Sequence, residues 1–312
     1  MMLLLTFRKN IQAVLQKYHV AVVPFVKFLQ GLIMMYSLQG IFGYHTVLSR
    51  FYIVIGVSAL CAIFPSGFLV FMFGVIATID LLKVSIEVAV MFAVMYVIMY
   101  LLYMRFSPKH SYLIILSPLL FMLHLGYLLP LLAAMFVGVL GIVPVICGTI
   151  IYYFSLYVKE AMTISTVATG DTKLQAYKYI LEGILKDKNL LLSMVIFAIV
   201  VVVTYFIYRL SIDYSWYIAI GAGTIVNILG FLLGSYALET EILVGGLFFG
   251  SIVAFAIAVI VQFFKCVVDY TRIENVQFED ENYYYYVKAI PKIDVPARDI
   301  SVKKINSRRV KR

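Results

Sequence analysis

Charged residues are scarce in this 312-residue sequence: Asp, Glu, Lys and Arg make up only 13% of the chain, against about 25% in a typical soluble domain. Hydrophobic residues make up 63%, and the mean hydropathy is +1.00. This composition excludes a soluble enzyme, a disordered chain and a disulfide scaffold. Only lipid solvates so much apolar side chain, so the sequence predicts an all-α polytopic membrane protein.

Cysteines and catalytic motifs are also scarce. The three cysteines, Cys61, Cys147 and Cys266, all lie in apolar runs and none belongs to a CxxC pair, which argues against a disulfide framework and a zinc site. The sequence contains no GxSxG, HExxH, Walker A or GxGxxG motif. We therefore expect no enzymatic activity, no cofactor and no metal.

The apolar runs predict six full membrane spans, at about Val20–Phe42, Leu82–Met104, Leu140–Tyr157, 190–210, 216–238 and 243–266. Two further runs are split, one by Phe64–Gly67 (FPSG) and one by His124–Gly126 (HLG). Each half holds about 12–14 residues and would reach only about 20 Å as a helix. The halves therefore form either re-entrant hairpins or short spans, giving up to ten spans in all.

The two split runs share a layout that indicates an internal duplication, in which 52–104 corresponds to 112–157. Gly67 and Gly126 each open the second short arm, and each block ends in a tyrosine-rich helix. The densest Lys and Arg lie at the chain ends, so both termini are predicted to be cytoplasmic, in the plasma (inner) membrane. In that topology the first hairpin enters from outside and the second from inside. The repeat would then be inverted, as in secondary transporters.

The remaining regions are predicted from their polar residues. Residues 1–18 read as an amphipathic interfacial helix, 19–157 as an N-terminal membrane region, and 158–188 as an amphipathic extramembrane insert. A three-helix membrane region (189–266) and a basic cytoplasmic tail (267–312) follow. The insert and the tail are candidate docking surfaces for partner proteins. The net charge of +9 gathers at the ends, a pattern typical of orientation and anionic lipid, so no nucleic acid is expected.

Charged residues inside the apolar runs are the first candidates for function. Asp80, Lys83 and Glu87 have helical spacings of three and four, which would place them on one helix face. They are either an interfacial charge group or the mouth of a site, with Glu87 as the deepest carboxylate and a candidate for proton coupling. Lys27 either snorkels to the headgroups or pairs with an internal partner such as Glu87.

Uncharged polar and small residues are the second group of candidates. His124 is either a hydrogen-bonded turn residue or part of a path. Asn227 lies in a stripe of small residues that favours close helix packing over substrate contact, and the last span repeats the pattern. The packing glycines are Gly223, Gly230, Gly234, Gly246 and Gly250. The predicted substrate path consists of Pro65, Ser66, Gly67, Glu87, His124, Gly126 and Asn227. Lys303, Lys304, Arg308 and Arg309 are predicted to meet lipid headgroups.

Two functional hypotheses follow from these patterns. The first is a transporter or permease-like component, which could be the membrane subunit of an export machine and would need a partner for any use of ATP. The second is a non-catalytic scaffold of an envelope, secretion or division complex. Broken helices support the first, and the amphipathic insert with the tyrosine-rich tail supports the second.

Overall fold

The computed structural model describes residues 18–106, 112–167, 172–210, 212, 214–240, 243–265, 274–279 and 284–289. The chain divides into two compact units. One spans Leu15–Phe263 and contains the helices, and the other includes Phe264–Arg312 and contains two strands. Each unit is considered by itself.

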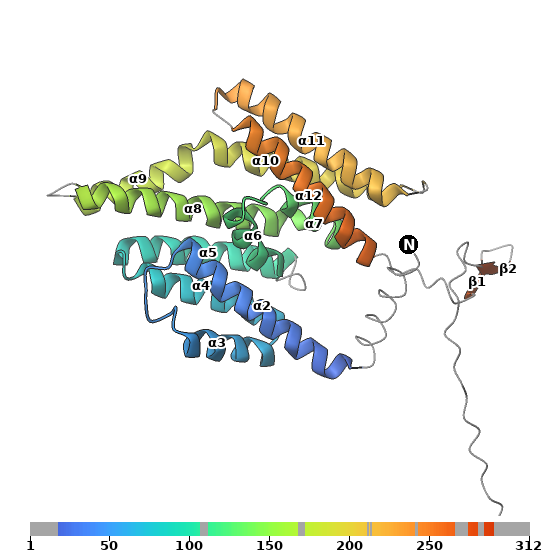
Figure 1. Cartoon of the computed structure of the whole chain (residues 1–312), viewed down its shortest axis with the longest axis horizontal. Coiled ribbons are helices and arrows are strands. Elements are labelled where there is room, and N and C mark those ends of the chain that lie inside the picture. Colours follow the sequence, from blue (N-terminus) through green and yellow to red (C-terminus); the bar gives the residue numbers. More distant parts are fainter. Residues whose placement is uncertain are drawn as a thin grey trace, which may run out of the picture. The chain divides into compact units, whose positions relative to one another are not determined.

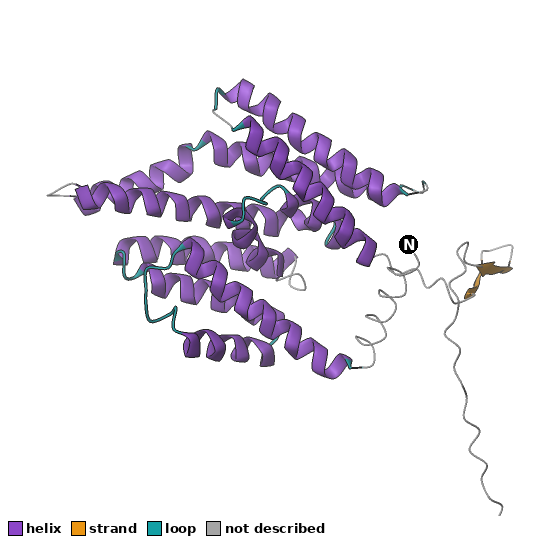
Figure 2. Cartoon of the chain, viewed as in Figure 1, coloured by secondary structure: helices purple, strands orange, loops and turns teal. Residues whose placement is uncertain are grey.

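The described part of the first unit is built from helices alone (Figures 1 and 2). Six of them, α2, α5, α8, α10, α11 and α12, are long and apolar enough to cross a membrane, at the six places where full spans are predicted. A predominantly α-helical, multi-pass membrane protein is therefore confirmed by the length and composition of these helices. The helices are α2 (His19–Ile41), α3 (Phe51–Ile63), α4 (Ser66–Leu81), α5 (Ile86–Phe106), α6 (Tyr112–Met122), α7 (Leu128–Phe136), α8 (Ile142–Val167), α9 (Thr172–Lys186), α10 (Lys188–Tyr208), α11 (Ser215–Leu238) and α12 (Val244–Lys265), with a 3₁₀ turn η1 (Val139–Gly141) before α8.

Four short helices occupy the two split runs. They hold 13 residues in α3, 16 in α4, 11 in α6 and 9 in α7. At 1.5 Å per residue they are about 14–24 Å long, less than the roughly 30 Å of a bilayer's hydrocarbon core. The arms of each pair pack mainly on long helices: α3 on α2, α4 on α5, α6 between α2 and α8, and α7 on α10.

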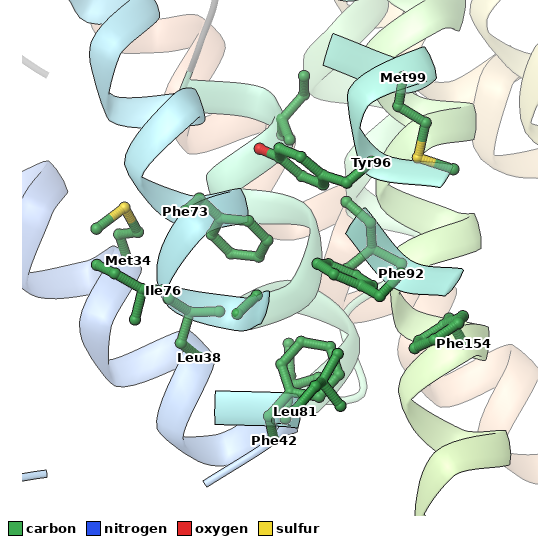
Figure 3. Packing of buried hydrophobic residues seen from close by; sticks show 14 of the residues in the cluster. Met34, Leu38, Phe42, Phe73, Ile76, Leu81, Phe92, Tyr96, Met99 and Phe154 are labelled. Carbon is green, nitrogen blue, oxygen red and sulfur yellow. The ribbon is translucent and has the colours of Figure 1, made fainter. Parts of the chain in front are cut away.

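An aromatic cluster holds α2, α4, α5 and α8 together (Figure 3). Phe92 of α5 lies at its centre. Its ring centroid is 5.6 Å from that of Phe42 on α2, 5.6 Å from that of Tyr96 and 5.2 Å from that of Phe154 on α8. Tyr96 in turn stacks on Phe73 of α4, so aromatic contacts connect all four helices.

A second cluster surrounds the shortest helix, α7. All eight residues from Leu128 to Met135 are buried, among side chains of α8, α10, α11 and α12. The long helix α8 belongs to both clusters, because Phe154 packs in the first and Val145 in the second. The first eight residues of α7 are therefore enclosed by other helices, although α7 is too short to cross a membrane by itself.

The end of α8 and the start of the insert differ from the prediction. α8 does not end at Tyr157 but continues to Val167, and α9 follows it. The hydroxyl of Tyr179 on α9 donates to Glu160 on α8 at 2.8 Å, and the Tyr157 and Tyr179 rings meet edge to face. The first ten residues of the predicted insert thus extend α8, and its second half contains a separate helix.

The second unit contains an antiparallel ribbon of β1 (Glu274–Glu279) and β2 (Tyr284–Ala289). Val276 pairs with Val287 and Phe278 with Tyr285. The chain is therefore not entirely α-helical, because the tyrosine-rich run forms a strand. The basic residues Lys303, Lys304, Arg308 and Arg309 lie outside the described residues, as do residues 1–17 of the predicted interfacial helix.

The contact between α6 and α8 depends on a missing side chain. A methyl group at Gly148 on α8 would overlap the side chain of Ser117 on α6. We expect Gly148→Ala to destabilise the protein by about 1–3 kcal/mol, the usual effect of overpacking. Thermal unfolding in detergent measures this. Gly56→Ala is the matched control, because a Cβ at Gly56 meets nothing within 4 Å; a similar loss in both variants would contradict the close packing.

Candidate functional site

The break between α6 and α7 is a defined helix-ending turn. The Leu125 amide donates to the carbonyl of Leu120 at 2.7 Å and the His124 amide to that of Phe121 at 3.0 Å. This is the Schellman pattern, which requires a left-handed residue after the helix. His124 supplies it with φ of 57°, and histidine is one of the few non-glycine residues enriched in that region. The predicted break at His124–Gly126 is therefore where α6 ends, and α7 begins at Leu128.

The turn lies below the ends of α11 and α12. Tyr127 packs on Phe231, with ring centroids 5.4 Å apart, and Phe231 lies seven residues before the end of α11. Tyr127 also covers Gly250, where a Cβ would come within 2.9 Å of its ring. Gly250 lies six residues after the start of α12. At 1.5 Å per residue, the turn therefore lies about 10 Å below the ends of α11 and α12.

A cavity of about 660 Å³ adjoins this turn. Its size is within the range of sites that hold one small molecule, about 300–1,000 Å³. The turn, α8, α10, α11 and α12 all contribute to its wall. The lining residues are Phe121, Leu123, His124, Leu125, Gly126, Tyr127, Tyr152, Tyr153, Asn189, Leu192, Ser193, Phe197, Phe231, Leu243, Gly246, Leu247, Phe249 and Gly250.

Apart from His124 and Tyr127 at the turn, the polar side chains of the wall lie on α8 and at the start of α10. The hydroxyls of Tyr153 on α8 and Ser193 on α10 are 3.1 Å apart and share a hydrogen bond. Asn189 lies one turn before Ser193, on the same face of α10, and is exposed. One turn further along, Phe197 is buried and packs on Phe231 with ring centroids 5.7 Å apart. The wall therefore changes from polar to apolar along one face of α10.

The turn of the first helix pair, at Phe64 and Pro65, lies beside the N-terminal half of α2. The Lys27 ammonium donates to the carbonyl of Phe64 at 3.1 Å, next to Pro65, which precedes α4. The second turn approaches α2 near Gly40, where the Met122 side chain fills the space of the missing Cβ. Lys27 and Gly40 are 13 residues apart, or about 20 Å along a helix. Lys27 thus caps the end of α3, while Glu87 lies in the first turn of α5.

Asp80, Lys83 and Glu87 do not share a helix face, which corrects the prediction from their spacing. α4 ends at Leu81 and α5 begins at Ile86, because the Ser85 hydroxyl accepts from the Val88 amide at 3.1 Å and caps the new helix. Lys83 and Glu87 are exposed. Asp80 lies in the last turn of α4 and is buried.

Asp80 holds the α2–α3 loop against the end of α4. Its carboxylate accepts the backbone amides of His45 at 2.6 Å and of Tyr44 at 3.2 Å. Burial and the nearby Asp80 charge raise the pKa of Tyr44 to about 12. The carboxylate therefore closes a loop and lies away from the cavity.

The predicted small-residue stripe faces α10. Gly223 lies against Thr204, Gly230 against Ile196, and Gly234 against Leu192. The Asn227 amide nitrogen donates to Ser251 of α12 at 3.3 Å, while its oxygen, which is buried, has no hydrogen-bond partner among the described residues. Asn227 thus connects α11 with α12 next to the cavity and does not line it.

The structure brings only part of the predicted path together. His124 and Gly126 line the cavity, together with Gly246 and Gly250, which were predicted as packing residues. Pro65, Ser66 and Gly67 belong to the other helix pair and Glu87 belongs to α5, and none of these four residues lines the cavity. Sequence reasoning missed Tyr153 and Ser193. The only signal was Asn189 and Ser193, two polar residues one turn apart at the start of an otherwise apolar span.

Comparison with known proteins adds no relative. No family model, curated protein or solved structure matches this chain.

Proposed function

We propose that this protein is a transporter or permease-like membrane component whose path runs through the cavity at the α6–α7 turn. One observation carries this proposal: the turn between two half-length helices lies about 10 Å below the ends of α11 and α12 and lines a cavity within the bundle. Irregular backbone at membrane depth is tolerated where protein buries it or where it lines a cavity, and transporters use such turns as binding sites.

The arrangement of the two short pairs supports an inverted repeat of re-entrant hairpins. Each pair precedes a long helix, α5 in the first block and α8 in the second. The first turn approaches the N-terminal half of α2 near Lys27, and the second approaches its C-terminal end near Gly40. Two hairpins that enter from opposite faces would place their turns in this way.

Cysteine labelling tests the re-entrant arrangement. Ser66→Cys and Leu125→Cys are introduced after Cys61, Cys147 and Cys266 are replaced by alanine, and a membrane-impermeant maleimide is applied from each side. We expect both positions to react at least about tenfold more slowly than Ser49→Cys in the exposed α2–α3 loop, since tenfold corresponds to only 1.4 kcal/mol of hindrance. Fast labelling of the two positions from opposite faces would instead indicate ten short spans.

Uptake into proteoliposomes tests the path. Radiolabelled sugars, amino acids, inorganic ions and neutral amphiphiles are screened, and His124→Gly is compared with His124→Ala on whichever solute is moved. Glycine keeps the left-handed turn, whereas alanine strains it. If the imidazole serves the path, both variants lose at least about tenfold in rate, or 1.4 kcal/mol. Wild-type uptake in both variants would remove His124 from the path, and wild-type uptake by Glu87→Gln would do the same for that carboxylate.

The scaffold hypothesis is the alternative, favoured by exposed apolar surface outside the long helices. Leu181 and Leu185 lie one turn apart on α9, and both are exposed. On β2 of the ribbon, Tyr285, Tyr286 and Val287 are also exposed. If deletion of 272–312 leaves every co-purifying protein in place, the tail is not a docking element.

A further inference from the structure

The chemistry of the cavity wall narrows what the cavity can hold. Among the described residues that line it there is no Asp, Glu, Lys or Arg, and His124 is the only side chain that ionises near neutral pH. An ionised ligand would lose its hydration there without meeting an opposite charge, which is strongly unfavourable. The wall therefore favours an uncharged ligand.

The wall is also divided into a polar and an apolar part. Tyr153 and Ser193 use one hydroxyl hydrogen on each other, so the pair retains one donor and free lone pairs for a ligand. Phe121, Phe197, Phe231 and Leu247 offer only hydrocarbon and aromatic surface. A ligand that satisfies both parts has a neutral hydrogen-bonding head and a hydrocarbon tail.

The cavity lies where membrane lipids, which have this chemistry, would reach it. Asn189 is the second residue of α10 and Leu243 immediately precedes α12, so both mark the starts of these spans, and both are exposed. The headgroup region of a bilayer meets helices at such ends. Ser193 and then Phe197 follow Asn189 inward at one-turn intervals, so the polarity of the wall falls in the same direction as that of a lipid from head to tail.

We propose that this cavity binds an uncharged amphiphile drawn from the membrane, with its head at Tyr153 and Ser193 and its hydrocarbon chain against Phe197 and Phe231. This inference rests on the proposed function, because it names the substrate class of the same site. Gly246 of α12 leaves open space in the wall, because a Cβ there would meet only the Cβ of Leu243, at 3.8 Å.

Photocrosslinking of the full chain in phosphatidylcholine nanodiscs tests the proposal. The probe is a monoacylglycerol with a diazirine in its acyl chain, and the comparison probe is the lysophosphatidic acid with the same chain. We expect saturable crosslinking of the neutral probe to peptides of α10 and α12 that line the cavity, and at least tenfold weaker labelling by the charged probe. Equal labelling by both probes overturns the proposal.

A matched pair of variants locates the site. Gly246→Trp places an indole in the cavity and is expected to lower labelling by the neutral probe at least tenfold. Gly245→Trp is the control, because Gly245 is also open to a new side chain but does not line the cavity; it should stay within twofold of the wild type. Wild-type labelling of Gly246→Trp overturns the proposal.

A second variant keeps the test independent of the tryptophan. Tyr153→Phe combined with Ser193→Ala removes the hydroxyl pair and is expected to weaken binding of the neutral probe about tenfold, while labelling by the charged probe stays as it was. Unchanged binding of the neutral probe overturns the assignment of the head. Movement of the probe between leaflets is measured separately. If the probe binds but does not move, the proposed transport function is contradicted and the proposed ligand is not. If another solute is taken up but the probe does not bind, the proposed ligand is contradicted and the transport function is not.

Discussion

Leu129→Lys is expected to leave no folded protein. Leu129 is 0% exposed and lies in the second residue of α7, where all eight residues up to Met135 are buried. An unpaired charge at such a site destabilises by about 3–5 kcal/mol, and loss of the packed leucine adds about 2–5 kcal/mol. The sum is comparable to the whole stability of a typical domain, about 5–15 kcal/mol. Size-exclusion chromatography in detergent should show aggregate in place of a monodisperse peak.

Leu101→Lys is the matched control for this substitution. Leu101 is 64% exposed and lies five residues before the end of α5, beside Arg105 on the same face. A lysine there can extend its ammonium to the interface, so the protein should remain monodisperse. A monodisperse Leu129→Lys variant with the unfolding temperature of the wild type would contradict the enclosure of α7.

The helix breaks could be read from the sequence because they depend on local chemistry. Pro65 has no amide hydrogen to donate and cannot continue α3, so the run divides there. His124 and Gly126 tolerate the turn that ends α6. Six long apolar segments likewise follow from composition alone, since twenty apolar residues in a row have few alternatives to a membrane span.

The cavity could not be read from the sequence because its wall comes from distant segments. Phe121, Ser193 and Gly250 lie more than fifty residues from one another along the chain, and no periodicity within one helix predicts that they converge. The glycine stripes show the same limit. Gly223 and Gly250 have the same spacing pattern, but one packs against α10 and the other lines the cavity. The spacing of glycines predicts a helix face made of small residues, but it does not predict what packs against that face.

The charged residues show why spacing can mislead. Asp80, Lys83 and Glu87 would share a face only if the helix ran through them, but Ser85 caps a new helix between them. The local cap outweighs the weak side-chain attraction at helical spacing, which contributes only about 0.2–0.5 kcal/mol per pair. The capping potential of Ser85 was the signal in the sequence that could have separated these charges.

Asp80→Ala is expected to free the loop between α2 and α3. The Asp80 carboxylate is 5% exposed and accepts the amides of His45 and Tyr44. Hydrogen bonds to a charged group contribute about 1.5–3 kcal/mol each, so removal of both should destabilise the protein by about 3 kcal/mol or more. Arg50 lies at the end of this loop and is exposed, so trypsin cleavage after Arg50 should become at least about tenfold faster, which 1.4 kcal/mol of loop opening already provides.

Two further variants show whether faster cleavage results from loss of the Asp80 hydrogen bonds or from loss of any negative charge in this region. Asp80→Asn retains one carbonyl oxygen and should keep one of the two bonds, so its cleavage rate is expected to fall between those of the wild type and Asp80→Ala. Glu87→Ala removes an exposed acid from the same region. Exposed charges contribute less than about 1 kcal/mol to stability, so the cleavage rate of this variant should stay within about twofold of the wild type. If Asp80→Ala is cleaved as slowly as Glu87→Ala, the loop is held by its apolar contacts, and the carboxylate is then available for another role.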